Sequence, residues 1–295
     1  MDDFKNLDNA QNVEIIANIF ANNKPISELK SDNPQCIILV GAPGVGKTTQ
    51  TERYLSELGY DYNKFYNISL DAIIEKVKPY RNTTMRVYRA LKGKNLNDKN
   101  LNDKNFGILN GIYLPTIMSH NTNLSLNTTE KKMMKKVANR HTLKNGGGKR
   151  KKVNQKSLKS LIELRDIGFV YGVENGLNII YDTTLTSRKD KISQNIMPVI
   201  EMSPLKYKIT VILVEATEDT IKKRLKERQS KMLIKEKPYI RAINPRAVKI
   251  HINENRIGYA NAKEYFEKGK YQKNIPDTKY TIDDFTFIQI ENLNV

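Results

Sequence analysis

The stretch CIILVGAPGVGKTT, residues 36–49, decides the fold of this chain. Residues 36–40 are consecutive apolar residues, as in a strand buried on both faces of a parallel sheet. Residues 41–48 then match the pattern G-x-x-x-x-G-K-[ST], whose glycines let backbone N–H groups turn toward phosphate oxygens. A helix from Thr48 to about Leu58 would direct its N-terminal dipole at the same anion. The order of strand, loop and helix therefore predicts a phosphate-binding loop (P-loop).

This pattern assigns the residues of an ATP site. The predicted ATP-binding residues are Gly41, Ala42, Pro43, Gly44, Val45, Gly46, Lys47, Thr48 and Thr49. Lys47 would reach the β- and γ-phosphates, and the Thr48 hydroxyl would ligate the Mg²⁺ that accompanies ATP.

Composition bounds the class of protein. The chain has 295 residues, a net charge of +18 and one cysteine, Cys36, which excludes internal disulfides. No apolar run approaches the about 18 residues of a membrane span, and Met1-Asp2-Asp3 does not begin a signal peptide. We expect a cytoplasmic protein that contacts no membrane, with Cys36 as a small buried apolar residue. The abundance of Asn, Lys and Ile is compatible with a viral origin, and nothing in the sequence specifies an oligomeric state.

Most of the positive charge lies in one segment, residues 92–156. This segment holds fifteen Lys/Arg against three acidic residues, and residues 94–98 are repeated in full as residues 99–103. The sequence therefore predicts an N-terminal lead-in helix within residues 1–32, a P-loop domain formed by residues 33–91 and 157–295, and a basic low-complexity insertion. The run Lys149–Lys152 has two interpretations, a nucleic-acid patch or nuclear address and a solvated surface run.

A second strand is predicted over residues 65–71, with Asp71 at or just past its end. The carboxyl ends of strands line the ligand site of an open α/β sheet, so this carboxylate would face the phosphates. Asp71 is thus a candidate general base for an attacking hydroxyl. The alternative is a structural one, in which Asp71 is only the N-cap of the helix that follows.

Two further strands are predicted, over residues 177–181 and 209–214. Asp182 and Thr184 follow the first of these, so Asp182 would hold Mg²⁺ through water or bind a substrate hydroxyl. The remaining predicted elements are a helix from Leu158 that ends at Gly176, a helix over residues 189–202 broken by Pro198, a helix over residues 219–228, and terminal strands over residues 280–282 and 285–290.

Several arginines lie in or after the predicted helix over residues 219–228. Arg224 and Arg228 are four residues apart, which places both guanidinium groups on one helix face. Phosphoryl transfer needs cations where negative charge develops, so both are candidate catalytic residues. Arg241 and Arg246 are weaker candidates, since isolated charges are usually solvated.

With these pieces in order, the chain resembles the zeta-toxin-like branch of P-loop kinases, which includes toxins that phosphorylate UDP-N-acetylglucosamine. GAPGVGKT is similar to the family's G-x-P-G-x-G-K-T loop, and Asp71, followed by Pro79-Tyr80, to the family's catalytic aspartate. The segment from Asp182 to Ser187 resembles the family's E-G-T-L segment, whose acidic residue and threonine contact the acceptor. Asp182 stands where the family has glutamate and Thr183 where it has glycine, which shortens the side chain and stiffens the backbone.

We therefore expect a three-layer α/β P-loop kinase fold, with a parallel sheet flanked by helices and a basic insertion. The expected reaction moves the γ-phosphoryl group of ATP to a hydroxyl of a small molecule, and the resemblance implies a nucleotide sugar. Two alternatives stay open. One is a polynucleotide end kinase, in which the insertion at 92–156 guides nucleic acid to the same site by phosphate contacts. The other is a non-catalytic nucleotide-dependent binding module.

Overall fold

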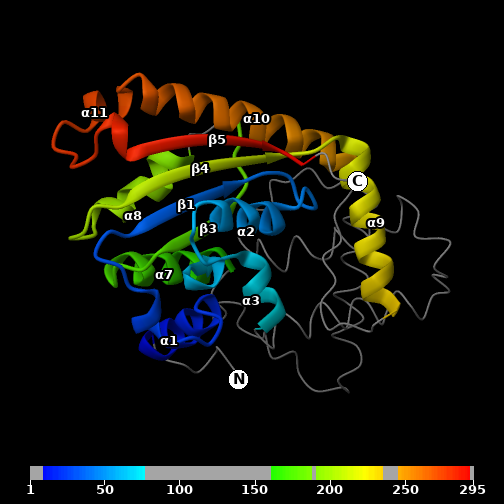
Figure 1. Cartoon of the computed structure of the whole chain (residues 1–295), viewed down its shortest axis with the longest axis horizontal. Coiled ribbons are helices and arrows are strands. Elements are labelled where there is room, and N and C mark those ends of the chain that lie inside the picture. Colours follow the sequence, from blue (N-terminus) through cyan, green and yellow to red (C-terminus); the bar gives the residue numbers. More distant parts are fainter. Residues whose placement is uncertain (1–8, 77–160, 188–190, 235–244, 293–295) are drawn as a thin grey trace, which may run out of the picture.

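The computed structural model describes residues 9–76, 161–187, 191–234 and 245–292. Its centre is a parallel sheet of five strands in the order β2-β3-β1-β4-β5 (Figure 1). The strands are β1 (Gln35–Val40), β2 (Tyr66–Ile68), β3 (Ile179–Thr183), β4 (Lys208–Glu215) and β5 (Phe285–Glu291). β1, which leads into the P-loop, is the middle strand and is flanked by β3 and β4. The predicted three-layer α/β fold is confirmed.

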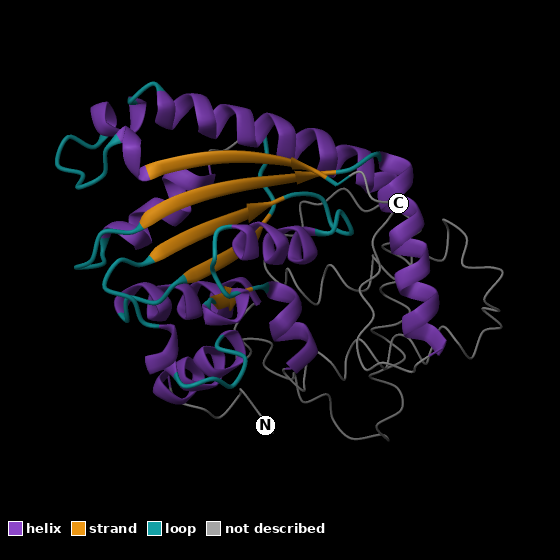
Figure 2. Ribbon diagram, in the orientation of Figure 1, coloured by secondary structure: helices purple, strands orange, loops and turns teal. Residues whose placement is uncertain are grey.

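Helices lie on both sides of this sheet (Figure 2). They are α1 (Asn9–Phe20), α2 (Lys47–Glu57), α3 (Leu70–Lys76), α7 (Leu161–Glu174), α8 (Met197–Glu201), α9 (Glu218–Ile234), α10 (Pro245–Glu267) and α11 (Lys270–Asn274). Alternate residues of β1 belong to two apolar clusters: Ile38 packs with residues of α1 and α7, and Ile37 with residues of α2 and α9. This alternation explains why β1 reads as an unbroken apolar run, since both of its faces are buried.

The predicted lead-in helix is α1, and it packs on the core. Its residues Ile16 and Phe20 are buried against Gly168 of α7, where an added Cβ would lie 2.3 Å from the Phe20 ring. Phe20 also meets Tyr66 of β2 edge to face, with ring centroids 5.6 Å apart. A glycine at position 168 thus lets α1 approach α7 closely enough to cover the β2 edge of the sheet.

The predicted bounds of two strands were wrong by two or more residues. β2 ends at Ile68 and α3 begins at Leu70, because the Ser69 hydroxyl accepts a hydrogen bond from the Asp71 N–H at 3.2 Å and caps the helix. β3 ends at Thr183 rather than Tyr181, since Leu39 and Val40 of β1 continue the parallel register to Asp182 and Thr183.

The chain after β3 differs most from the prediction. Residues 280–282 are not a strand: Thr281 and Asp284 hydrogen-bond each other in a capping box that starts a 3-10 turn before β5. Pro198 lies at the start of α8, directly after a π-helical turn over Ile192–Ile196. The 23-residue helix α10 was not predicted; it runs along the β5 edge (Figure 1).

Some predictions fall on residues that the structure does not describe. The insertion at 92–156, the run Lys149–Lys152 and Arg241 lie outside the described ranges, as does Leu158. Within those ranges, no helix combines the length and the apolar character that a membrane span requires.

Candidate functional site

The P-loop connects the carboxyl end of β1 to the first turn of α2. Gly44 and Gly46 have φ angles of +85° and +93°, a region that other residues adopt only with strain. Both glycines also lie against other elements: a Cβ on Gly44 would be 2.8 Å from Leu225 of α9, and a Cβ on Gly46 would be 2.4 Å from Asn292. The motif therefore requires glycine here for the turn itself and for the close approach of α9 and of the chain after β5.

Lys47 is the first residue of α2, and its side chain returns over the loop. Its ammonium donates a hydrogen bond to the Gly41 carbonyl at 2.9 Å and lies 3.4 Å from Oδ1 of Asp182. The Lys47 side chain is only 12% exposed, whereas Thr48 and Thr49 are exposed in the same helical turn. The predicted phosphate-binding cation thus lies inside the loop, beside a carboxylate.

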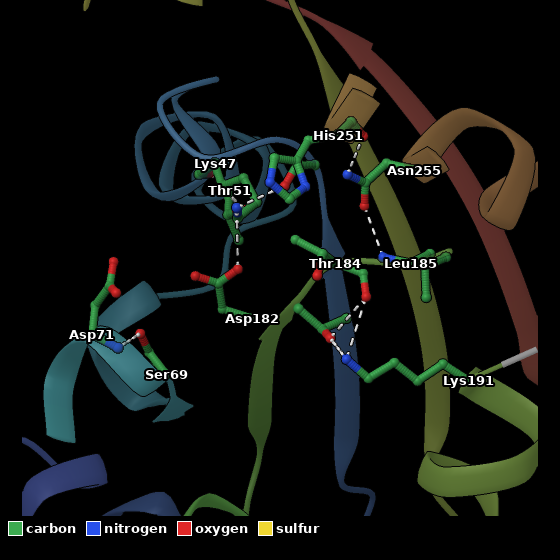
Figure 3. A network of polar contacts seen from close by, with 12 residues as sticks. Lys47, Thr51, Ser69, Asp71, Asp182, Thr184, Leu185, Lys191, His251 and Asn255 are labelled. Carbon is green, nitrogen blue, oxygen red and sulfur yellow. Dashed lines mark hydrogen bonds and ion pairs between the residues drawn. The ribbon is translucent and has the colours of Figure 1, made fainter. Parts of the chain in front are cut away.

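The pairing of strands in the sheet places Asp182 beside Lys47. β3 is hydrogen-bonded to β1, and Asp182 pairs with Leu39, two residues before the P-loop begins. Its side chain is 30% exposed and points toward Lys47 (Figure 3). In P-loop proteins, Mg²⁺ is held by the loop Ser/Thr and by an aspartate at the end of a nearby strand. Asp182 and Thr48 supply oxygen donors of the kind that Mg²⁺ prefers, so these residues fit that ion.

Asp71 lies in the first turn of α3, after the edge strand β2. Because Ser69 fills the N-cap position, the alternative that Asp71 serves only as the N-cap is wrong. The Asp71 side chain is half-buried. Figure 3 shows its carboxylate and that of Asp182 at the same end of the sheet, where the parallel strands end. β2 and β1 are separated by β3, so Asp71 and the P-loop flank the end of β3. A phosphate acceptor bound over β3 would lie between them.

The segment after β3, residues 184–187, is here called the acceptor loop. α10 holds this loop through two consecutive side chains. Asn255 Oδ1 accepts a hydrogen bond from the Leu185 N–H at 2.8 Å, and the Glu254 carboxylate accepts from the Ser187 N–H at 2.7 Å and from its hydroxyl. Gly258, one turn further along α10, allows the Thr186 backbone to approach, since a Cβ there would be 2.9 Å from the Thr186 carbonyl oxygen.

Lys191 binds the start of the same loop from another direction. Its ammonium donates hydrogen bonds to the Thr183 hydroxyl and to the Thr184 carbonyl, the latter at 3.3 Å (Figure 3). The pKa of Lys191 is lowered from 10.5 to about 8, mainly by burial and also by the nearby positive charge of Arg165, against the opposing effect of Asp166 and Asp182. Lys191 thus holds Thr184, the predicted acceptor-binding residue, through the backbone carbonyl of Thr184.

The predicted arginines have different outcomes. Arg224 lies against the P-loop, where its guanidinium donates to the Val45 carbonyl at 3.0 Å and to Asn292 Oδ1 at 3.3 Å. Arg228 and Arg246 lie in α9 and α10, but the structure does not describe their side chains. Their catalytic roles, and that of Arg224, stay predictions.

Sequence reasoning missed Asn255 and Asn292, two buried asparagines that hydrogen-bond to loops of the site. A signal for Asn255 exists in the sequence. Positions 248, 252, 255, 259, 262 and 266 share one face of α10, and all but Asn255 are apolar. A polar residue within an apolar helical stripe marks a buried hydrogen bond. No local signal distinguishes Asn292, since its partner Val45 is 247 positions away.

No protein-family model matches the chain, and no curated protein matches it in sequence. Among solved structures, the chain is similar to one from the molecular and structural characterization of the PezAT chromosomal toxin–antitoxin system of the human pathogen Streptococcus pneumoniae. The identity is 12%, the match covers 96% of this chain and 81% of that chain, and the TM-score is 0.41.

Proposed function

We propose that this protein transfers the γ-phosphoryl group of ATP to a hydroxyl of a small molecule, with nucleotide sugars as the acceptor class to test first. The observation that supports this proposal is the position of Lys47, whose ammonium lies inside a P-loop and 3.4 Å from Asp182 on the adjacent strand. A cation and a carboxylate so placed can bind the β- and γ-phosphates and their Mg²⁺, respectively.

Each residue has a proposed role in this reaction. Lys47 and the loop N–H groups bind the β- and γ-phosphates, and Thr48 and Asp182 hold the Mg²⁺, which neutralises charge between those phosphates. Asp71 accepts the proton of the attacking hydroxyl. Thr184 and Asp182 contact the acceptor. Arg224 and Arg228 are the candidates for stabilising the charge that develops in the transition state.

The test is transfer of labelled γ-phosphate from ATP, with nucleotide sugars in one pool and 5′-hydroxyl oligonucleotides in another. Asp71→Asn keeps the shape of the side chain but removes the base, so turnover should fall about 10²- to 10⁴-fold while nucleotide affinity is retained. Asp61→Ala is the matched control, because Asp61 caps the turn before β2, at the opposite end of that strand. Lys47→Ala should abolish both binding and transfer.

Each result distinguishes between the candidates. Transfer to the sugar pool that Asp71→Asn removes supports the proposal. Transfer only to oligonucleotides, lost at high salt, would replace it with an end kinase. ATP binding without transfer to either pool would leave a nucleotide-dependent binding module.

A further inference from the structure

The carbonyl of Val45, in the P-loop, accepts hydrogen bonds from two residues distant in sequence. Asn292 donates to it from Nδ2 at 2.8 Å, and Arg224 donates from Nη1 at 3.0 Å. Asn292 follows the last residue of β5 and is only 5% exposed. The end of the last strand therefore contacts the loop that follows the first strand.

The direction of this carbonyl matters for phosphate binding. A peptide group is planar and trans, so its C=O and its N–H point in opposite directions. Two donors that hold the Val45 carbonyl on one side of the loop therefore hold the Gly46 N–H on the other side. A P-loop binds phosphate oxygens through such N–H groups. The two hydrogen bonds thus fix the orientation of one phosphate-binding amide.

Asn292 is itself held in place by two further hydrogen bonds, and Gly46 leaves room for its side chain. Its Oδ1 accepts from Arg224 Nη2 at 3.3 Å, and its backbone N–H donates to the Glu215 carbonyl at the end of β4 at 2.7 Å. Gly46 has no side chain, and only for that reason can the Asn292 amide lie where it does.

We propose that Asn292 is a positioning residue for nucleotide binding, which together with Arg224 orients the Val45–Gly46 peptide toward the phosphates. This inference rests on the proposed function only in requiring that the P-loop binds a nucleoside triphosphate. Because coupling between two sites is reciprocal, a bound nucleotide also stabilises the end of β5.

The first test measures the affinity for a non-hydrolysable ATP analogue by calorimetry. Asn292→Asp keeps the size of the side chain and the oxygen that faces Arg224, but it replaces the donor to Val45 with an oxygen. We expect its dissociation constant to rise about tenfold or more, as when a residue that orients a binding group is removed, and Asn292→Ala to show the same direction. Asn178→Ala is the matched control: it removes an asparagine that accepts from the Gln35 N–H at 3.0 Å, at the other end of β1. Its dissociation constant should stay within about twofold of wild type, although its melting temperature falls.

A second measurement needs no variant. Hydrogen exchange of the wild-type chain should show slower exchange at the Asn292 N–H when the analogue is added, so the inference stays testable if the variants do not fold. Unchanged affinity in folded Asn292 variants, or unchanged exchange at the end of β5, would overturn the inference while the proposed function stands. Failure of the wild-type chain to bind the analogue would overturn both.

Discussion

Replacing Lys191 with methionine should change how the stability of the protein depends on pH. The Lys191 side chain is half-buried near Arg165, and the pKa of its ammonium is lowered from 10.5 to about 8 in the folded state. At about 1.4 kcal/mol for each pH unit, keeping this group charged in the fold costs about 3 kcal/mol. Its hydrogen bonds to Thr183 and Thr184 return part of that cost, about 1 kcal/mol each. Lys191→Met should therefore stabilise the fold by about 1 kcal/mol at pH 7.

The sign of the pH dependence follows from linkage. Below pH 8 the folded and unfolded states both hold the Lys191 proton, and the fold bears the full cost. Between pH 8 and 10.5 the folded state loses this proton while the unfolded state keeps it, so the free energy of unfolding rises with pH. Buried tyrosines act in the opposite direction above about pH 10. Tyr62, for example, has its pKa raised to about 12 by burial, so only the unfolded state ionises there. The rise is therefore visible between about pH 8 and 9.5.

The assay is urea unfolding followed by circular dichroism at several values between pH 7 and 9.5. The wild-type free energy of unfolding should rise across this range by more than that of Lys191→Met. Lys206→Met serves as the control for the loss of one positive charge, since Lys206 is 46% exposed and pairs with Asp284 on the surface. Equal slopes for wild type and Lys191→Met would refute the reasoning.

Two further predictions concern buried groups, one on α10 beside the acceptor loop and one at the start of β1. Asn255→Ala leaves the Leu185 N–H without its partner, which should lower the free energy of unfolding by about 1–3 kcal/mol and raise KM for the phosphate acceptor. A lower melting temperature with unchanged KM would show that acceptor binding does not depend on Asn255. Cys36 is fully buried, and burial raises the pKa of its thiol to about 12, so a thiol reagent should label it only when the protein unfolds. Rapid labelling of the folded protein would contradict the place of Cys36 in β1.

The sequence was most informative where local rules decide the structure. The P-loop was predictable because its glycine spacing, the preceding apolar strand and the following helix all lie within residues 36–58. Asp182 was predictable as a strand-end carboxylate, but its ion pair with Lys47 depends on β3 lying next to β1, which is a property of the strand order. The role of Ser69 as a cap was missed because Ser69 and Asp71 are both favourable N-cap residues two positions apart. α10 was missed although its apolar stripe is regular, because the polar Asn255 interrupts it.

Two residues that support the site come from a later part of the chain than the motif residues that define it. Those of the motifs, Lys47, Asp71 and Asp182, all precede β4, whereas Asn255 and Asn292 belong to α10 and to the end of β5. Each of these asparagines hydrogen-bonds to the backbone of one loop, Asn292 to the P-loop and Asn255 to the acceptor loop. A phosphate or a hydroxyl is bound best by groups whose directions are fixed in advance. A chain with every motif residue but without α10 and β5 would lose one such support for each loop. The motifs therefore specify the chemistry of the proposed site, and residues of the last third of the chain help to hold that site in the geometry that the chemistry needs.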